Sequence, residues 1–151
     1  MMTLRMELFV NNLAVSSDFY CRILGFEKEK ESERYIAVKS GNAILGLGLL
    51  SKLSSNHPLR PKSPYERVGG GVEIVLEIDD IETYYQRIVS EKYPIQEPLQ
   101  QRSWGLTDFR IIDPDGYYLR ITSKNKSSRA ELLNGLGKRA QEPVKPVLPE
   151  S

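Results

Sequence analysis

The sequence predicts an α+β protein built from two βαβββ modules. Apolar and polar residues alternate in many short segments, which is typical of strands with one buried face. The order strand, helix and three strands occurs twice along the chain. A segment rich in proline and glycine separates the two copies. We therefore expect modules at residues 1–50 and 72–124, a linker at 51–71, and a C-terminal tail at 125–151.

The bulk properties are those of an ordinary globular protein. The 151 residues are 40% hydrophobic and 27% charged, and 21 basic residues nearly balance 20 acidic ones. A net charge of +1 argues against nucleic acid or an anionic membrane as a partner. No apolar run is long enough to span a membrane, and no signal peptide is evident. With Cys21 as its single cysteine, we expect a cytoplasmic protein without disulfides.

The first module opens with a strand. Every second residue near the N-terminus is apolar, which predicts a strand over residues 1–10. Its other face carries Arg5, Glu7 and Phe9, so this face is mixed in character. The pair Asn11-Asn12 then marks a turn.

A helix with amphipathic spacing is predicted at residues 15–24. Ser16, Ser17 or Asp18 could cap its N-terminus, and Gly25 stands where a glycine commonly ends a helix. The other strands of this module are expected at residues 26–30, 35–39 and 43–50.

The second module repeats this order. A strand is predicted at residues 72–78, and Asp79-Asp80 stands in the place of Asn11-Asn12. A helix with an apolar stripe follows at 81–89. The next strand, at 95–102, contains a proline and is therefore expected at the edge of its sheet.

The module ends with the sequence WGLTDFRIIDPDGYYLR, residues 104–120. It predicts a strand, a tight turn and a returning strand. Pro114 presets φ in this turn, and Gly116 suits a φ that other residues resist. The polar face of the returning strand carries Arg120. Beyond it, residues 128–136 predict a short helix, and three prolines after Gln141 predict an open tail.

Two segments and the repeat together resemble the vicinal oxygen chelate superfamily of glyoxalases, bleomycin resistance proteins and extradiol dioxygenases. The segments are residues 10–26, which include DFYCRILGF, and residues 104–120. The resemblance covers roughly residues 4–123. It implies that each module curls into a half-barrel sheet, that a ligand cavity lies between the sheets, and that the protein is a homodimer.

Metal-using members of this superfamily have four ligand positions, and the resemblance implies which residues of this chain stand there. Carried onto this chain, they are Arg5, then Leu45 or Leu47, then Glu73 and Arg120. Divalent metals in such sites need imidazole or carboxylate ligands, whereas a guanidinium is always charged and has no lone pair to offer. We therefore expect no metal and no cofactor.

The resemblance and the residues together indicate a metal-independent protein that binds and sequesters an anionic or aromatic small molecule. The expected ligand-binding residues, on an Arg/Glu floor and an aromatic wall, are Arg5, Glu7, Phe9, Glu73, Trp104 and Arg120. No catalytic residue is assigned, and His57 in the linker is expected to be solvated.

Three other interpretations remain open at this point. The Arg/Glu floor could be a salt-bridge network with only a structural role. The protein could be a metal-dependent lyase, isomerase or dioxygenase that uses Glu73 with Glu7 or Glu77. It could also be an interaction module whose C-terminal segment docks on a partner.

Overall fold

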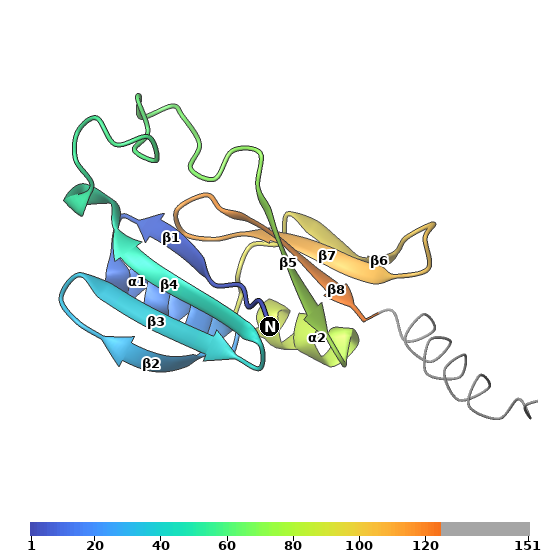
Figure 1. Cartoon of the computed structure of the whole chain (residues 1–151). Coiled ribbons are helices and arrows are strands. Elements are labelled where there is room, and N and C mark those ends of the chain that lie inside the picture. Colours follow the sequence, from blue (N-terminus) through green and yellow to red (C-terminus); the bar gives the residue numbers. More distant parts are fainter. Residues whose placement is uncertain (125–151) are drawn as a thin grey trace, which may run out of the picture.

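Two four-stranded sheets make up the fold of the computed structural model, which describes residues 1–124 (Figure 1). The first sheet has the strand order β1-β4-β3-β2, and the second has the order β5-β8-β7-β6. Neither sheet closes into a barrel. The C-terminal helix and open tail predicted within residues 125–151 lie outside the described residues.

The two modules have the same order of elements. The first consists of β1 (Met6–Val10), α1 (Leu13–Asp18), the π-helical turn η1 (Phe19–Ile23), β2 (Glu27–Glu31), β3 (Tyr35–Ser40) and β4 (Ala43–Leu49). After the 3-10 turn η2 (Leu50–Lys52), the second consists of β5 (Glu73–Ile78), α2 (Ile81–Ser90), β6 (Glu97–Gln101), β7 (Thr107–Ile112) and β8 (Tyr118–Ser123).

Strand pairing confirms the internal repeat. In each module the first strand runs parallel to the last, so that Met6 lies opposite Leu45 in one sheet and Ile74 opposite Leu119 in the other. The remaining pairs are antiparallel. As predicted, β6 is an edge strand, and its pairing with β7 is irregular between Glu97 and Gln100.

The two helices begin at equivalent residues. Asn12 caps α1, because its Oδ1 accepts the Val15 N–H at 3.1 Å, and the Oδ1 of Asp80 accepts the Thr83 N–H at the same distance. Both caps follow the first strand of their module by two residues, as the repeated Asn-Asn and Asp-Asp pairs suggest.

The expected cap at Ser16, Ser17 or Asp18 was wrong. Helix α1 starts at Leu13, two residues earlier than predicted, and Ser16 and Ser17 are buried within it. Asn12 is the better cap because its extended backbone, with φ of −142°, lets the side chain turn back to the helix. The predicted end is confirmed: Gly25 follows the helix with φ of +82°.

One core joins the two modules. Helix α1 lies behind the first sheet in Figure 1, and α2 packs against β7 and β8. The largest fully buried side chains come from both modules and include Phe19, Tyr20, Ile88, Phe109 and Leu119. The apolar strand faces therefore meet the helices, and the mixed faces are left open.

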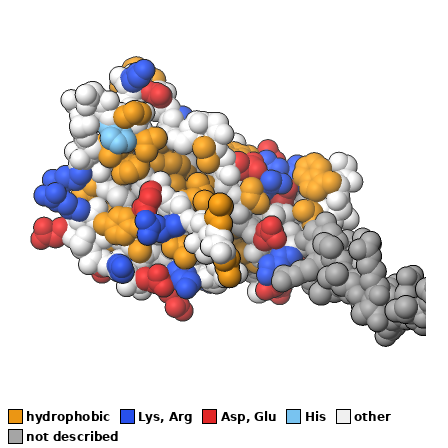
Figure 2. All heavy atoms as spheres, viewed as in Figure 1, with side chains coloured by type: hydrophobic (Ala, Val, Ile, Leu, Met, Phe, Trp, Pro, Cys, Tyr) orange, Lys and Arg blue, Asp and Glu red, His pale blue; other side chains and the backbone are white. Residues whose placement is uncertain are grey.

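The open faces carry polar and apolar groups together. Figure 2, in the same view, shows the open face of the first sheet, where acidic and basic side chains lie among hydrophobic ones. On the open face of the second sheet, the apolar side chain of Val75 in β5 is 41% exposed and lies between the charged residues Glu73 and Glu77 of the same strand. Within residues 1–124, no helix is both long and apolar enough to cross a membrane.

Tyr117 fastens the second module to the edge of β1. Its hydroxyl accepts the Phe9 N–H at 3.0 Å and donates to the Phe9 carbonyl at 2.9 Å. As β1 is an edge strand, these backbone groups of Phe9 have no neighbouring strand on that side. The Tyr117 hydroxyl thus supplies the two hydrogen bonds that the backbone of a neighbouring strand would otherwise make with Phe9.

Two carboxylates of the Asp113–Gly116 turn complete this contact. Asp113 Oδ2 accepts from the Tyr20 hydroxyl at 2.8 Å, and Asp115 Oδ1 accepts from the Asn11 N–H at 2.8 Å. We call the contacts of Asp113, Asp115 and Tyr117 with the first module the module joint. The turn has the predicted geometry, since Gly116 has φ of +104°.

Candidate functional site

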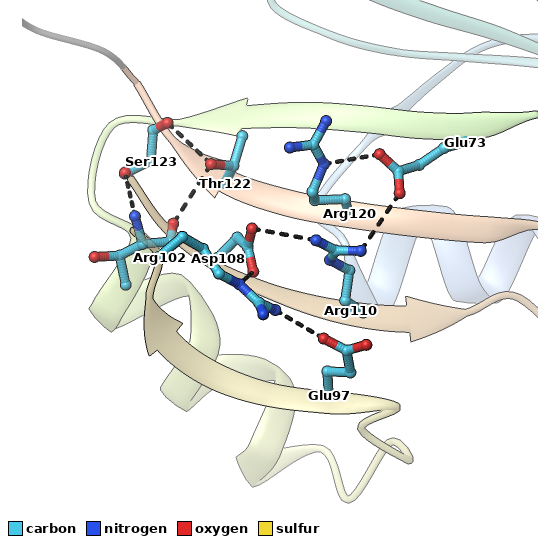
Figure 3. A network of polar contacts seen from close by, with 9 residues as sticks. Glu73, Glu97, Arg102, Asp108, Arg110, Arg120, Thr122 and Ser123 are labelled. Atoms are coloured by element: carbon cyan, nitrogen blue, oxygen red, sulfur yellow. Dashed lines mark hydrogen bonds and ion pairs between the residues drawn. The ribbon is translucent and has the colours of Figure 1, made fainter. Parts of the chain in front are cut away.

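Charged residues of alternating sign cross the open face of the second sheet (Figure 3). We call this set the charge ladder; in order of contact it consists of Glu97, Arg102, Asp108, Arg110, Glu73 and Arg120. The residues come from β5, β6, β7, β8 and the connection after β6, and alternation along the strands brings them to one face. The set holds three acids and three arginines.

The middle of the charge ladder is buried. Asp108 is fully buried, and its Oδ1 accepts from Arg102 Nε at 2.7 Å, while Oδ2 lies 3.5 Å from an Arg110 terminal nitrogen. A second Arg102 nitrogen donates to Glu97 at 2.7 Å. Hydrogen bonds to Glu97 and Asp108 raise the pKa of Arg102. Removal of a carboxylate from water requires such partners, so the arginines hold Asp108 in place.

The outer end of the ladder, at Glu73 and Arg120, is more accessible than this middle. Glu73 lies between two arginines: Oε1 accepts from Arg120 Nε at 2.8 Å, and Oε2 lies 3.5 Å from Arg110. The Arg120 side chain is 26% exposed, and its terminal nitrogens make no hydrogen bond to any residue in 1–124. Val75, the neighbour of Arg120 on β5, adds apolar surface beside these free N–H groups. This end can therefore receive an acidic group attached to an apolar body.

The open face of the first sheet has a smaller polar cluster. Arg5 Nε pairs with Glu7 Oε1 at 2.7 Å, and the Tyr35 hydroxyl donates to the same oxygen at 3.2 Å. The side chains of Glu7 and Tyr35 lie over Gly46, where a Cβ would collide with both. The burial of Tyr35 and the nearby charge of Glu7 raise its pKa.

The predicted linker lies against the module joint. Residues 53–72, between η2 and β5, contain no helix or strand. Arg67 Nε donates to the Gly116 carbonyl at 2.9 Å, and Gly69, with φ of +67°, packs so closely on the Tyr117 ring that a Cβ would not fit. A hollow of about 660 Å³ lies between the linker, Asn11 and Asp115.

His57 is less solvated than predicted. Its Nδ1 accepts the Leu59 N–H at 3.1 Å, and its ring centroid lies 6.4 Å from that of Phe9. The side chain is half-buried at the edge of the first open face.

Comparison with known proteins identifies the family. The family description Glyoxalase/Bleomycin resistance protein/Dioxygenase superfamily matches residues 3–121, which is most of the chain. The protein belongs to this superfamily. No curated protein matches the sequence.

Solved structures show the same fold at low sequence identity. A superfamily member from Sphaerobacter thermophilus is 22% identical with a TM-score of 0.63, covering 82% of this chain and 98% of the other. A lactoylglutathione lyase from Agrobacterium tumefaciens is 17% identical with a TM-score of 0.62, at 81% and 92% coverage. TioX from Micromonospora sp. ML1 is 18% identical with a TM-score of 0.64, at 82% and 98% coverage. These likenesses establish the fold alone.

The second metal-ligand position implied by the superfamily resemblance falls on a different residue. Leu45 and Leu47 are buried at 3% and 0% exposure and face the core, so neither reaches the open face. Because Leu45 pairs as Leu119 does, Gly46 is the counterpart of Arg120. The four positions are therefore Arg5, Gly46, Glu73 and Arg120. Within the described part of the chain, no three His, Cys, Asp or Glu residues are grouped as metal ligands would be.

The residues predicted to bind ligand fall into three places. Arg5, Glu7 and Phe9 belong to the first module, and Glu73 and Arg120 to the second. Trp104 is 56% exposed between β6 and β7, where the Arg102 guanidinium lies 6.0 Å from its ring.

No hydrogen bond or ion pair in residues 1–124 joins Arg5 to Glu73 or Arg120, so their expected convergence stays a prediction. The second arginine at Glu73 is Arg110, which was not among the expected ligand-binding residues. The alternation of Asp108, Phe109 and Arg110 along the predicted strand was the signal that pointed to it.

Proposed function

We propose that the protein binds and sequesters an anionic small molecule on the open face of its second module. One observation carries the proposal. Arg120 donates from Nε to Glu73, whereas its two terminal nitrogens have no partner in residues 1–124. A guanidinium held at one end and open at the other is well suited to bind a carboxylate through two N–H groups. Val75 beside it would contact the apolar part of such a ligand.

We propose further that binding needs no metal. Among Arg5, Gly46, Glu73 and Arg120, only Glu73 could donate an oxygen ligand; its Oε1 already accepts from Arg120, and its Oε2 is paired with Arg110 at 3.5 Å. Two guanidinium groups near a divalent cation would repel it. The donor set therefore does not fit the metal that other superfamily members use, and this favours a binding protein over a metal-dependent lyase, isomerase or dioxygenase.

Benzoate is a suitable first probe, because it joins one carboxylate to an apolar ring. We expect it to shift the backbone amide resonances of Glu73, Val75 and Arg120 in an NMR titration, and Arg120→Gln to weaken binding at least about tenfold. Binding should persist in EDTA.

Arg22→Gln is the control, because Arg22 pairs with Asp18 on the helix side and is distant from the charge ladder. Unchanged benzoate affinity in Arg120→Gln would contradict the role of Arg120. Binding that EDTA abolishes and a divalent metal restores would instead favour the metal-dependent alternative.

We also propose that the protein is a homodimer. The mixed faces of both sheets are open in the single chain, and Val75 on the face of the second sheet is 41% exposed. A second copy facing them would shield this apolar surface and could bring Arg5 and Phe9 of one chain near Glu73 of the other.

A further inference from the structure

The linker places another arginine at the face that carries Arg120. Arg67 Nε donates to the Gly116 carbonyl, and its guanidinium carbon lies 5.7 Å from the centroid of the Tyr118 ring. Gly69 fits against Tyr117 only because it lacks a side chain. These contacts hold Arg67 beside the start of β8, although it belongs to a segment without helix or strand.

Tyr118 connects the two arginines. Tyr118 and Arg120 are alternate residues of β8, so their side chains share the open face at a separation of roughly 7 Å along the strand. Tyr118 lies opposite Glu73, and its hydroxyl interacts with Arg110. The ring thus stands between Arg67 on one side and the outer end of the charge ladder on the other.

Both arginines have unused donors. Each uses its Nε for a bond within the protein, to Gly116 in one case and Glu73 in the other. Within residues 1–124, the terminal nitrogens of neither side chain make a hydrogen bond. The guanidinium groups of Arg67 and Arg120 therefore lie on either side of the Tyr118 ring. Each has two terminal nitrogens whose N–H groups suit the two oxygens of a carboxylate.

We propose that this site recognises a dicarboxylate, with one carboxylate at Arg120, the other at Arg67, and the chain between them lying across Tyr118. This inference rests on the proposed function, because it assigns the second acidic group of the ligand that Arg120 binds. It makes the linker part of the binding site and Arg67 the residue that selects a diacid over a monoacid.

Glutarate and pentanoate provide a matched test, because both have five carbons and only glutarate has a second carboxylate. By calorimetry, we expect the full-length protein to bind glutarate at least about tenfold more tightly than pentanoate. Arg67→Gln should abolish this preference, because it should weaken the binding of glutarate much more than that of pentanoate. Arg120→Gln should weaken the binding of both acids, and Arg67→Lys should restore part of the preference.

Arg60→Gln is the control within the same linker. Arg60 donates to the Leu53 carbonyl at 2.7 Å, whereas within residues 1–124 the guanidinium over the Tyr118 ring is that of Arg67, so the preference for glutarate should survive the loss of Arg60. Equal affinity for the two acids, or a preference that persists in Arg67→Gln, would overturn the inference while the proposed function stands. If neither acid binds, both fall. Amide NMR spectra of each variant would confirm that it is folded.

Discussion

Asp113 uses its two carboxylate oxygens for different tasks. Oδ2 accepts from the Tyr20 hydroxyl of the other module, while Oδ1 accepts three backbone N–H groups of its own turn, each at 2.9 Å. Burial raises the pKa of Asp113, and although the hydrogen bonds from Tyr20 and the turn act in the opposite direction, burial prevails. The ionised carboxylate of Asp113 therefore lowers the stability of the folded protein at neutral pH.

This burial predicts a pH dependence of stability. The folded protein binds the Asp113 proton more tightly than the unfolded chain, whose carboxyl has a pKa near 3.8. The cost of ionisation is therefore fully present above the raised pKa and disappears as the pH falls towards 3.8. As the pH falls from above this raised pKa towards 3.8, we expect the free energy of unfolding of the wild type to rise relative to that of Asp113→Asn.

Urea unfolding of both proteins at a series of pH values would measure the difference. The asparagine keeps an oxygen for the backbone N–H groups but does not titrate, so other carboxyl groups cancel in the comparison. Parallel curves for the two proteins would show that burial does not perturb Asp113.

At the scale of elements, alternation was enough to locate strands that have neighbours on both sides. The predicted strand at residues 35–39 is β3, Tyr35–Ser40, which pairs with β2 and β4. The first strand was predicted too long, because alternation continues through residues 1–5. These residues are exposed, and pairing with β4 begins only at Met6. A pattern of side chains does not reveal whether a partner strand is present to complete the hydrogen bonds.

The candidate site was predictable only in part, for a related reason. Counting on from Gly116 located Arg120, and counting back from Asp79-Asp80 located Glu73. This counting did not reveal that Glu73 would pair with Arg110, because that choice depends on how β7 aligns with β8, where Arg110 lies opposite Arg120. The position of Arg67 depends on the path of the linker, which has no periodic pattern to follow.

Tyr117 offers a test of how the second module holds strand β1. In Tyr117→Phe, the N–H and carbonyl of Phe9 lose the hydroxyl that binds both. We expect a loss of about 1 to 2 kcal/mol in the free energy of unfolding, because the site is only partly buried and water can replace some of the bonding. Urea denaturation followed by circular dichroism would measure it.

Tyr65→Phe is the matched control. Tyr65 lies in the linker at 96% exposure, so loss of its hydroxyl should change stability by less than about 0.5 kcal/mol. Similar effects of the two substitutions would argue against a special role for the Tyr117 hydroxyl.

At the scale of the whole molecule, one side is closed and the other is open. The helices and the core close one side of both sheets, whereas the charge ladder, Val75 and the Arg5–Glu7 pair lie on the other. The proposed homodimer would use this open side. Its ligand site would then be enclosed by groups from two chains, which would exclude water and strengthen the interactions of Arg120.

The dimer can be tested with a charge at Val75. Val75→Glu should raise the dimer dissociation constant, because it places a carboxylate in the apolar part of the proposed interface. Val89→Glu is the control: Val89 has the same 41% exposure but lies on α2, away from the open face. Light scattering over a range of concentrations would distinguish them. A wild-type protein that remains monomeric at high concentration would contradict the proposal.

The module joint makes the two modules of the repeat unequal. Because Leu45 and Leu119 are counterparts in their pairing, the residue of the first module that corresponds to Tyr117 is Ala43. Ala43 has no hydroxyl, so the hairpin of the first module could not fasten to β5 as Tyr117 fastens to β1. If the chain descends from a duplicated βαβββ ancestor, this tyrosine marks a point at which the two copies ceased to be interchangeable. Exchanging their order would then leave the edge of the leading strand without its partner.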